Sequence, residues 1–304
     1  MRSTGMGVTK VVAALVAATF ALSACSAGAA VDDQTVVPTT VPAGVEIAAP
    51  STLVGAWGVD ATGVPPGSVL RLGIDDLSPG LSMSGPGCAV DGSWRSAVGG
   101  LFTTVVVTAA GECSQYTDTG GRSVPEFLAL ASGFGRRAGQ LVLTGADGSV
   151  VAALIAGATP VPRPNEPTEF LSVPVLTEKA RFALDAPTVP LPGVRPASQA
   201  QIEGSWRPEE QKNPQSSLSF TGADARWRGS DGCNGIGGSW ALAAFGGSFI
   251  AVGGASTGIG CNNDNTSSIE GASYAGFDGE VLVFGDKDGK VVGRFIRSPT
   301  PTSS

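Results

Sequence analysis

The chain has 304 residues, of which 44 are glycine and 21 are proline, and charged residues make up 15%. Lys and Arg number 19 against 26 Asp and Glu, so the formal net charge is −7. An acidic chain without a basic patch argues against binding to nucleic-acid phosphates. The sequence contains no histidine, which excludes Ser-His-Asp and Cys-His catalysis and His-ligated metal sites.

Residues 1–24 have the pattern of a bacterial lipoprotein signal peptide. Arg2 and Lys10 are followed by an uncharged run, residues 11–22, that is too short to span a bilayer comfortably. The run leads into Leu22-Ser23-Ala24-Cys25, which resembles the lipobox at which a peptidase cuts before the cysteine. The resemblance implies a diacylglycerol on the Cys25 sulfur, and two acyl chains suffice for stable anchoring. The alternative is an ordinary signal peptide with a chance cysteine.

The next two segments are predicted to be a flexible tether, residues 25–50, and a β-rich domain, residues 51–158. Within the domain, Val105-Val106-Val107 indicates a buried strand, and residues 125–131 indicate a helix with Pro at an early position. Residues 141–148, followed by the alternating segment 150–155, predict a β-hairpin.

Residues 159–200 contain nine prolines and are predicted to form a semi-rigid linker. A short helix near residues 176–184 could dock on either neighbouring domain. Residues 201–298 are predicted to form a second β-rich domain, with a buried strand at 249–252 and a hairpin over 281–296. A weaker helix is expected around 268–274, where Gly271 is unfavourable. Residues 299–304 are a tail.

The two domains are copies of one unit. Gly-x-Trp recurs at residues 55–57 and 204–206, Gly-Cys at 87–88 and 232–233, and Gly-Ser-Trp at 92–94 and 238–240. Because four of the five tryptophans fall at repeat positions, we expect them to pack in the two cores.

Four cysteines remain once Cys25 is assigned to the lipid, and four cysteines allow three pairings. Cys88 and Cys113 are 25 residues apart, and Cys233 and Cys261 are 28 apart. If each pair belongs to one domain, the disulfides are Cys88–Cys113 and Cys233–Cys261, each contributing about 3–4 kcal/mol. The alternative is a four-thiolate metal site, which the lack of a Cys-x-x-Cys pair disfavours.

The second copy resembles the META domain, also called HslJ-like, on three motifs in order: the Gly-x-Trp, Gly232-Cys233-Asn234, and Thr257 four residues before Cys261. The first copy is diverged, with Ala89 in place of the asparagine and Ala109 in place of the threonine. The resemblance implies an antiparallel sheet curled toward a barrel, no established catalytic residues and an envelope location. The expected fold class is therefore mainly β (α+β): two small antiparallel sheet or partial-barrel domains, each with at most one short helix and one disulfide.

Trp227 has no partner in the first copy and stands between Arg226 and Arg228. Alternation along a strand would place the two arginines on one face and Trp227 on the other. One interpretation puts Trp227 in the core with solvated arginines, and the other makes the three residues an exposed contact strip for a partner.

Together with the resemblance, these patterns favour a non-enzymatic binding or stress-related envelope module, lipid-anchored to the outer face of the cell membrane. The membrane is one expected partner, and a protein or cell-wall component is another. No residue is assigned to catalysis, to a cofactor or to a metal. Two alternatives remain open. One is an inhibitor of a lysozyme-like hydrolase or a protease, and the other is a hydrolase that uses carboxylates alone, with the two carboxylates about 5–10 Å apart.

Overall fold

The computed structural model describes residues 43–299 except 76–77, 112–123, 161, 163–170, 223 and 257–268. Contacts between Cα atoms divide the chain into two units, Met1–Thr35 and Val36–Ser304, and every element described below belongs to the second unit. The predicted signal peptide, Cys25 and most of the predicted tether lie outside the described residues. Across residues 43–299 with these gaps, no helix has the length and apolar character needed to cross a membrane.

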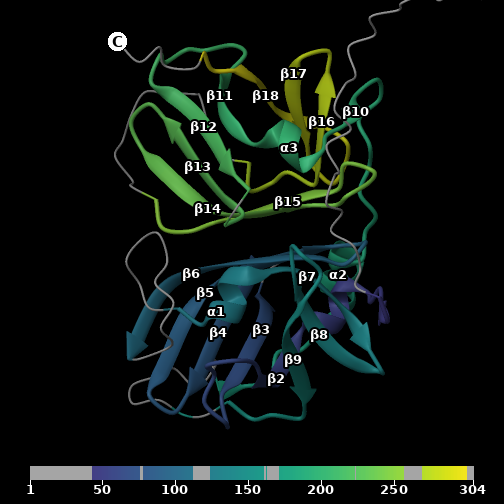
Figure 1. The fold of residues 1–304 in the computed structure, drawn as a ribbon, viewed down its shortest axis with the longest axis vertical. Helices are drawn as coiled ribbons and strands as arrows, with labels where there is room; N and C mark the ends of the chain where they lie inside the picture. The colour runs from purple at the N-terminus through teal and green to yellow at the C-terminus, as the bar shows by residue number, and fades with distance from the viewer. Residues whose placement is uncertain are drawn as a thin grey trace, which may run out of the picture. The chain divides into compact units, whose positions relative to one another are not determined.

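The first sheet is a closed antiparallel barrel of eight strands (Figure 1). We call it the first barrel, and its strands are β2 (Gly55–Asp60), β3 (Val69–Asp75), β4 (Ser78–Gly85), β5 (Cys88–Ala97), β6 (Leu101–Gly111), β7 (Ala131–Arg137), β8 (Gln140–Gly145) and β9 (Val150–Ala156). β9 pairs with β2, and β7 pairs with both β6 and β8, which completes the ring. The two-residue strand β1 (Val45–Glu46) pairs with β7.

Two short helical elements accompany the first barrel. The 3-10 helix η1 (Pro50–Leu53) precedes β2, and the helix α1 (Glu126–Leu130) precedes β7. α1 matches the helix predicted over 125–131, with Pro125 as its N-cap. Phe127 and Leu128 are buried in the barrel core, and the Leu128 carbonyl accepts a hydrogen bond of 2.9 Å from Thr104 Oγ1. α1 therefore fills part of the barrel interior.

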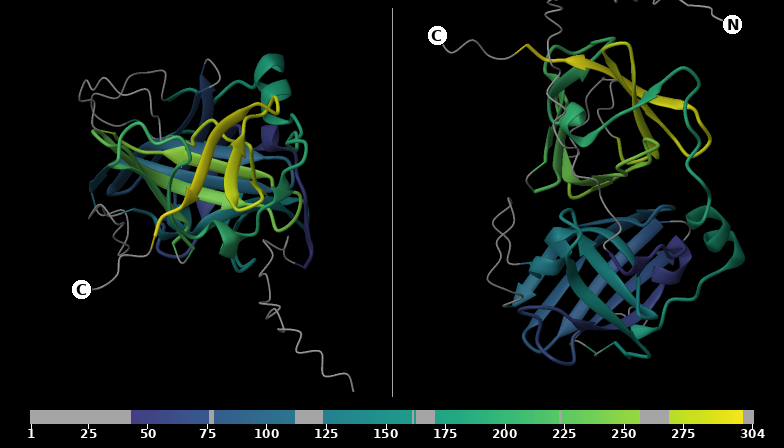
Figure 2. Two further views of the ribbon diagram at one scale, coloured as in Figure 1. Left: turned by 90° about the horizontal axis from the view of Figure 1, so that it is seen from above. Right: turned by 45° about the vertical axis from the view of Figure 1, so that its right-hand side comes forward.

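The second sheet repeats the strand order of the first. It contains β10 (Arg195–Pro196), β11 (Gly204–Pro208), β12 (Ser216–Thr221), β13 (Arg226–Asp231), β14 (Gly235–Leu242), β15 (Phe249–Gly253), β16 (Tyr274–Asp278), β17 (Val281–Gly285) and β18 (Val291–Arg297). Its ends meet at a bridge between Ser248 and Tyr274, so this sheet also curls round on itself (Figure 2). The predicted mainly-β fold is thus confirmed.

Local structure also tests the finer predictions for the second sheet. The helix α3 (Gln199–Ile202) precedes β11 as η1 precedes β2. The strand at 249–252 and the hairpin of β17 and β18 are confirmed. The helix expected around 268–274 is wrong for its described part: residues 269–273 are not helical, and Tyr274 begins β16. Gly271 and the demands of the following strand outweigh the weak helical pattern.

The repeat motifs have the same role in both sheets. The indole N–H of Trp57 donates to Leu53 O at 2.8 Å, and that of Trp206 donates to Ile202 O at 2.7 Å. The indole of Trp94 donates to carbonyls of β3 and β4, and that of Trp240 donates to carbonyls of β12 and β13. Trp94, Trp206 and Trp240 are buried, while Trp57 is partly buried against the core. Buried indoles therefore meet their hydrogen-bonding needs at matching positions.

The glycine of each Gly-Ser-Trp motif has a steric explanation. A Cβ at Gly92 would overlap the carbonyl oxygen of Val105 on β6. A Cβ at Gly238 would overlap the carbonyl oxygen of Val252 on β15. Because the neighbouring strand approaches so closely, only glycine fits at this position of either sheet.

The segment between the sheets contains the helix α2 (Glu178–Leu184), as predicted. Just after it, Asp185 accepts hydrogen bonds from the backbone N–H and hydroxyl of Ser51, at 2.8 and 2.7 Å. Further on, the hydroxyls of Thr188 and Ser248 are 2.8 Å apart. α2 therefore docks on the first barrel, and the chain then follows the second sheet. β1 and β10 lie within the predicted tether and linker.

Two of the four predicted disulfide cysteines are described. Cys88 and Cys233 are both disulfide-bonded. Cys113 and Cys261, their predicted partners, lie outside the described residues, so the pairing remains a prediction. In the first barrel Cys88 is in register with Gly111, and Cys113 follows two residues later.

Candidate functional site

Both sheets present two strands to a shared contact. β5 and β6 of the first barrel contact β14 and β15 of the second sheet. Part of this contact is a small apolar cluster of Leu101, Ala241 and Ile250, each at most 5% exposed. The outer faces of these four strands are therefore removed from solvent by each other, which explains the run of buried residues along β6 and β15.

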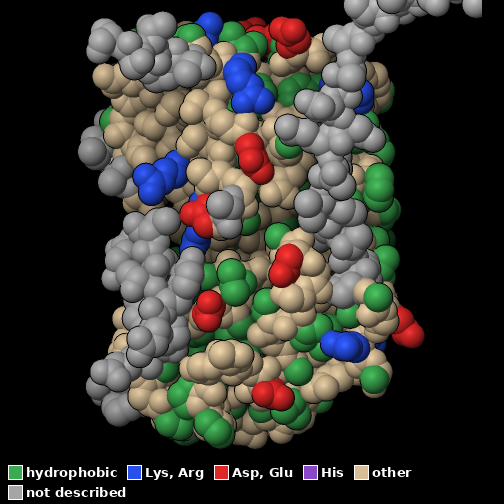
Figure 3. All heavy atoms as spheres, viewed as in Figure 1, with side chains coloured by type: hydrophobic (Ala, Val, Ile, Leu, Met, Phe, Trp, Pro, Cys, Tyr) green, Lys and Arg blue, Asp and Glu red, His purple; other side chains and the backbone are tan. Residues whose placement is uncertain are grey.

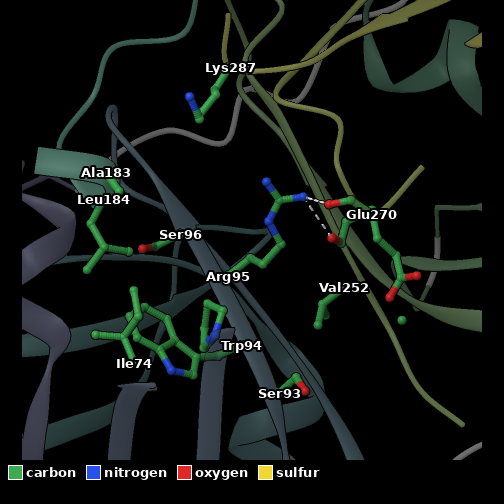
Figure 4. Close-up of a pocket in the computed structure, with 13 residues that line it drawn as sticks. Ile74, Ser93, Trp94, Arg95, Ser96, Ala183, Leu184, Val252, Glu270 and Lys287 are labelled. Atoms are coloured by element: carbon green, nitrogen blue, oxygen red, sulfur yellow. Dashed lines mark hydrogen bonds between the residues drawn. The ribbon is translucent and has the colours of Figure 1, made fainter. Parts of the chain in front are cut away.

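A cavity of about 440 Å³ opens beside the cluster; we call it the inter-sheet cleft (Figure 4). Small-molecule sites have volumes of roughly 300–1,000 Å³, so its size is within that range. The lining comes from β3 to β5, α2, β15 and the segments around residues 270 and 287: Ile74, Pro79, Ser93, Trp94, Arg95, Ser96, Ala183, Leu184, Ala251, Val252, Gly253, Glu270 and Lys287. A smaller cavity of about 90 Å³ shares Arg95, Ser96 and Lys287 with it.

Arg95 is the central polar residue of the cleft. Its Nη1 donates to Ala251 O at 3.2 Å, to Ala272 O at 3.1 Å and to Glu270 O. Figure 4 shows Glu270 on one side of the guanidinium and Ser96 and Leu184 on the other. Burial lowers the pKa of the Arg95 side chain to about 10, and the Glu270 carboxylate acts in the opposite direction. Arg95 therefore carries a positive charge at neutral pH while binding one carbonyl of β15 and two of the segment that precedes β16.

Two further polar side chains line both cavities. The Ser96 hydroxyl oxygen is shielded from solvent and has no hydrogen-bond partner among the residues that the structure describes. Lys287 is exposed, and its Nζ lies 2.7 Å from Asp288 Oδ1. Among the residues that the structure describes, Glu270 contributes the single carboxylate of the cleft lining. The lining thus combines two cationic groups, one carboxylate and apolar walls.

The residues predicted as a contact strip lie on β13, away from the cleft lining. Trp227 is 1% exposed, and its indole donates to Val252 O at 3.2 Å, so the exposed-strip interpretation is wrong for Trp227 and the core interpretation is confirmed. Arg226 is partly buried and donates to Ser239 Oγ at 2.9 Å, while Arg228 is exposed. Strand alternation turns the indole inward, as the pattern of β13 requires.

Sequence reasoning missed Arg95. A usable signal existed in the repeat, because Trp94 is followed by Arg95 whereas its counterpart Trp240 is followed by Ala241. With Trp94 pointing into the core, the next side chain points outward, where an arginine ordinarily reaches solvent. The contact with β15 and with the segment at residues 270–272 makes that outward position partly buried.

Charged side chains on the face shown in Figure 3 are spaced apart, and neither sign gathers into a continuous area. Comparison of the chain with family models, with curated proteins and with solved structures finds no match. The resemblance to the META domain therefore rests on the sequence motifs.

Proposed function

We propose that this protein is an exported, lipid-anchored binding protein of the bacterial cell envelope, built from two META-like sheets, whose ligand site is the inter-sheet cleft. The observation that carries the proposal is the cleft itself, a cavity of about 440 Å³ lined from both sheets and from α2. Neither sheet alone supplies the lining, so the duplicated arrangement is needed for the site. Apolar walls with a few polar groups are typical of ligand sites.

The lining supports binding without requiring chemistry. Arg95 is committed through Nη1 to backbone carbonyls, and Lys287 pairs with Asp288. A carboxylate-only hydrolase needs two carboxylates facing one substrate. The cleft lining, as far as the structure describes it, offers Glu270 alone. The proposed role is therefore to hold a protein or cell-wall component at the membrane surface.

Anchoring is tested by Cys25→Ser, which removes the thiol that would carry the lipid. We expect the protein to move from the membrane fraction to the soluble fraction. The matched control is Ser23→Ala, which keeps a small residue in the lipobox and should leave the protein in membranes. A Cys25→Ser protein that stays with the membrane would contradict the lipid anchor.

Binding at the cleft is tested by site-specific photo-crosslinking in intact cells. A photo-crosslinking lysine analogue replaces either Lys287, which lines the cleft, or Lys212, which is exposed elsewhere. We expect a discrete adduct from position 287 and none from position 212. Equal labelling at both positions, or none at either, would contradict the assignment of the inter-sheet cleft as the ligand site. If the soluble protein inhibits muramidases or proteases, the result would instead indicate that it is an inhibitor.

A further inference from the structure

The inter-sheet cleft contains an arginine whose donors are only partly used. A guanidinium has five N–H donors in a rigid fork. In Arg95, Nη1 donates to the three carbonyls of Ala251, Glu270 and Ala272. Among the described residues, no acceptor is bonded to Nε or Nη2 of this side chain. Those two nitrogens present parallel N–H groups along one edge of the guanidinium, and that edge faces Ser96 and Leu184 in Figure 4.

Parallel N–H groups of this kind match the two oxygens of a carboxylate, and such bidentate pairs are the strong, geometrically specific hydrogen bonds of proteins. From this edge of Arg95 and the polar and apolar groups around it, we propose that the inter-sheet cleft binds a carboxylate attached to a small apolar group, such as the carboxyl end of a short peptide. The inference deepens the proposed binding function and rests on it.

Ser96 gives independent support. Its hydroxyl is shielded from solvent and has no hydrogen-bond partner among the described residues, although it lines both cavities. A buried hydroxyl without a partner is unfavourable and uncommon in folded proteins, so such groups call for an explanation. A polar group of a ligand that fills these cavities would give the Ser96 hydroxyl a partner.

The charges around the cleft favour an anion. Arg95 and Lys287 are cationic, and Glu270 is the single acidic residue of the lining in the described part of the chain. In Figure 4 the Glu270 carboxylate is directed away from the guanidinium, to which it presents its backbone carbonyl. A ligand anion would therefore meet the guanidinium edge without facing the carboxylate directly.

The rest of the lining limits the ligand further. Ile74, Leu184 and Val252 present apolar surface, and a free phosphate would leave that surface unused. The volume of about 440 Å³ exceeds what a single inorganic anion fills. A carboxylate with an apolar substituent uses both parts of the cleft, because the substituent gains from leaving water while the carboxylate pairs with Arg95.

The test uses residues 26–304 as a soluble protein and N-acetyl-alanine as the probe, with binding measured by calorimetry or NMR titration. N-acetyl-alaninamide is the matched uncharged probe, and inorganic phosphate is the rival anion. We expect the amide and phosphate each to bind about tenfold more weakly than N-acetyl-alanine. The amide cannot offer two carboxylate oxygens to the Arg95 guanidinium, and phosphate has no apolar group to contact the apolar walls of the cleft.

Three variants locate the site. Arg95→Lys keeps a positive charge but removes the fork, and Ser96→Ala removes one hydroxyl; we expect about tenfold and about threefold weaker binding of N-acetyl-alanine. Lys287→Gln should weaken binding, whereas Lys290→Gln in the same turn, which does not line the cleft, should leave it unchanged. The unfolding midpoint of each variant confirms that it is folded, and the Ser96 variant keeps the test decisive if Arg95→Lys is unstable.

Equal binding of acid and amide, tighter binding of phosphate, or no binding of any probe would overturn the carboxylate assignment. That failure is distinguishable from failure of the proposed function. A crosslinked adduct at position 287 with no binding of N-acetyl-alanine would leave the cleft as a site for another ligand. Loss of the adduct would refute the binding function at the cleft itself.

Discussion

The two sheets share one strand order but fill their interiors differently. Register places Leu72 and Phe220 opposite the glycine that begins the Gly-x-Trp motif, so the two residues occupy equivalent positions. By the same comparison of paired residues, the second sheet has phenylalanine at two more positions where the first barrel has leucine: Phe284 for Leu143 and Phe295 for Leu154. The second core is therefore aromatic, where the first is mainly aliphatic.

The first barrel obtains its interior volume from other positions. The fully buried Met83 pairs with Leu70, and Gly229 pairs with Leu218, the equivalent leucine of the second sheet. Met83 and Gly229 are therefore equivalent positions. α1 adds Phe127 and Leu128 to the same core. Cores tolerate such exchanges when total volume and patterning are kept. The comparison shows that strand register and the Gly-x-Trp and Gly-Ser-Trp motifs are common to both copies, whereas the side chains that fill each interior are not.

The largest expected effect comes from removing one ring of the second core. The centroid of the Phe284 ring lies 5.0 Å from the ring centroid of Phe249 and 5.8 Å from that of Phe295. Phe284→Ala should lower the free energy of unfolding by about 4 kcal/mol, and Leu143→Ala in the first barrel by about 3 kcal/mol, as measured by urea unfolding. Val291→Ala, at a 45% exposed position, is the control. A larger loss at Leu143 would contradict the aromatic character assigned to the second core.

A smaller and equal effect is expected in both sheets from the motif glycines. Gly92→Ala and Gly238→Ala each place a methyl group against a carbonyl oxygen of the next strand, and each should cost about 2–3 kcal/mol in thermal or urea unfolding. Gly80→Ala and Gly235→Ala are matched controls, because a Cβ at either site meets nothing within 4 Å. Clearly unequal costs at Gly92 and Gly238 would show that the two sheets do not share this close approach.

The smallest expected effect is a pH dependence of stability that the Gly-Cys turn of the second sheet has and that of the first barrel lacks. In the second sheet Asp231 Oδ1 accepts from Asn234 N at 2.6 Å and from Cys233 N at 2.8 Å, and these bonds hold the pKa of the Asp231 carboxyl below its ordinary value. Because the pKa is lower in the folded protein than the unfolded value of about 3.9, the ionised Asp231 carboxylate stabilises the folded state at pH values above about 3.9. This stabilisation is lost as the pH falls through the folded-state pKa. Gly85 occupies the equivalent position in the first barrel.

Asp231→Asn should therefore flatten the acid side of the stability profile, measured by urea unfolding between about pH 2.5 and 6, a range that spans the unfolded pKa. Asp286→Asn, in the turn between β17 and β18, is an informative companion because the pKa of Asp286 is lowered by hydrogen bonds from Lys290 and Asp288. An unchanged acid slope in Asp231→Asn would show that the turn bonds do not persist in solution.

Much of the fold could be predicted from local patterns. β-branched runs and Gly turns predicted the strands at 105–107 and 249–252, and also the hairpin that ends each sheet, β8–β9 and β17–β18. These signals depend only on neighbours in sequence. The closure of the first barrel could not be predicted in this way, since β6 and β7 are joined through a single residue pair, Leu101 with Gly133. β1 and β10 were missed because a two-residue strand has no periodicity to detect.

The cleft was not predictable, for a related reason. Its lining draws on residues as far apart as Ile74 and Lys287, and Arg95 reads as an ordinary outward-facing side chain. Sequence patterns report which face of a strand is apolar but do not report what covers the opposite face. Trp227 shows the converse case, in which alternation alone was enough to place a residue in the core.

The contact between the sheets joins counterparts. β5 and β6 correspond in the repeat to β14 and β15, and these are the strands that touch. Such self-complementary pairing is the rule in symmetric homodimers, where one patch meets its own copy. Duplication and fusion of a dimeric one-sheet ancestor would produce this arrangement directly. Two identical halves would carry the same residue after both motif tryptophans. In this chain Arg95 follows Trp94 and lines the cleft, whereas Ala241 follows Trp240 and packs in the apolar cluster, so the two sides of the contact differ.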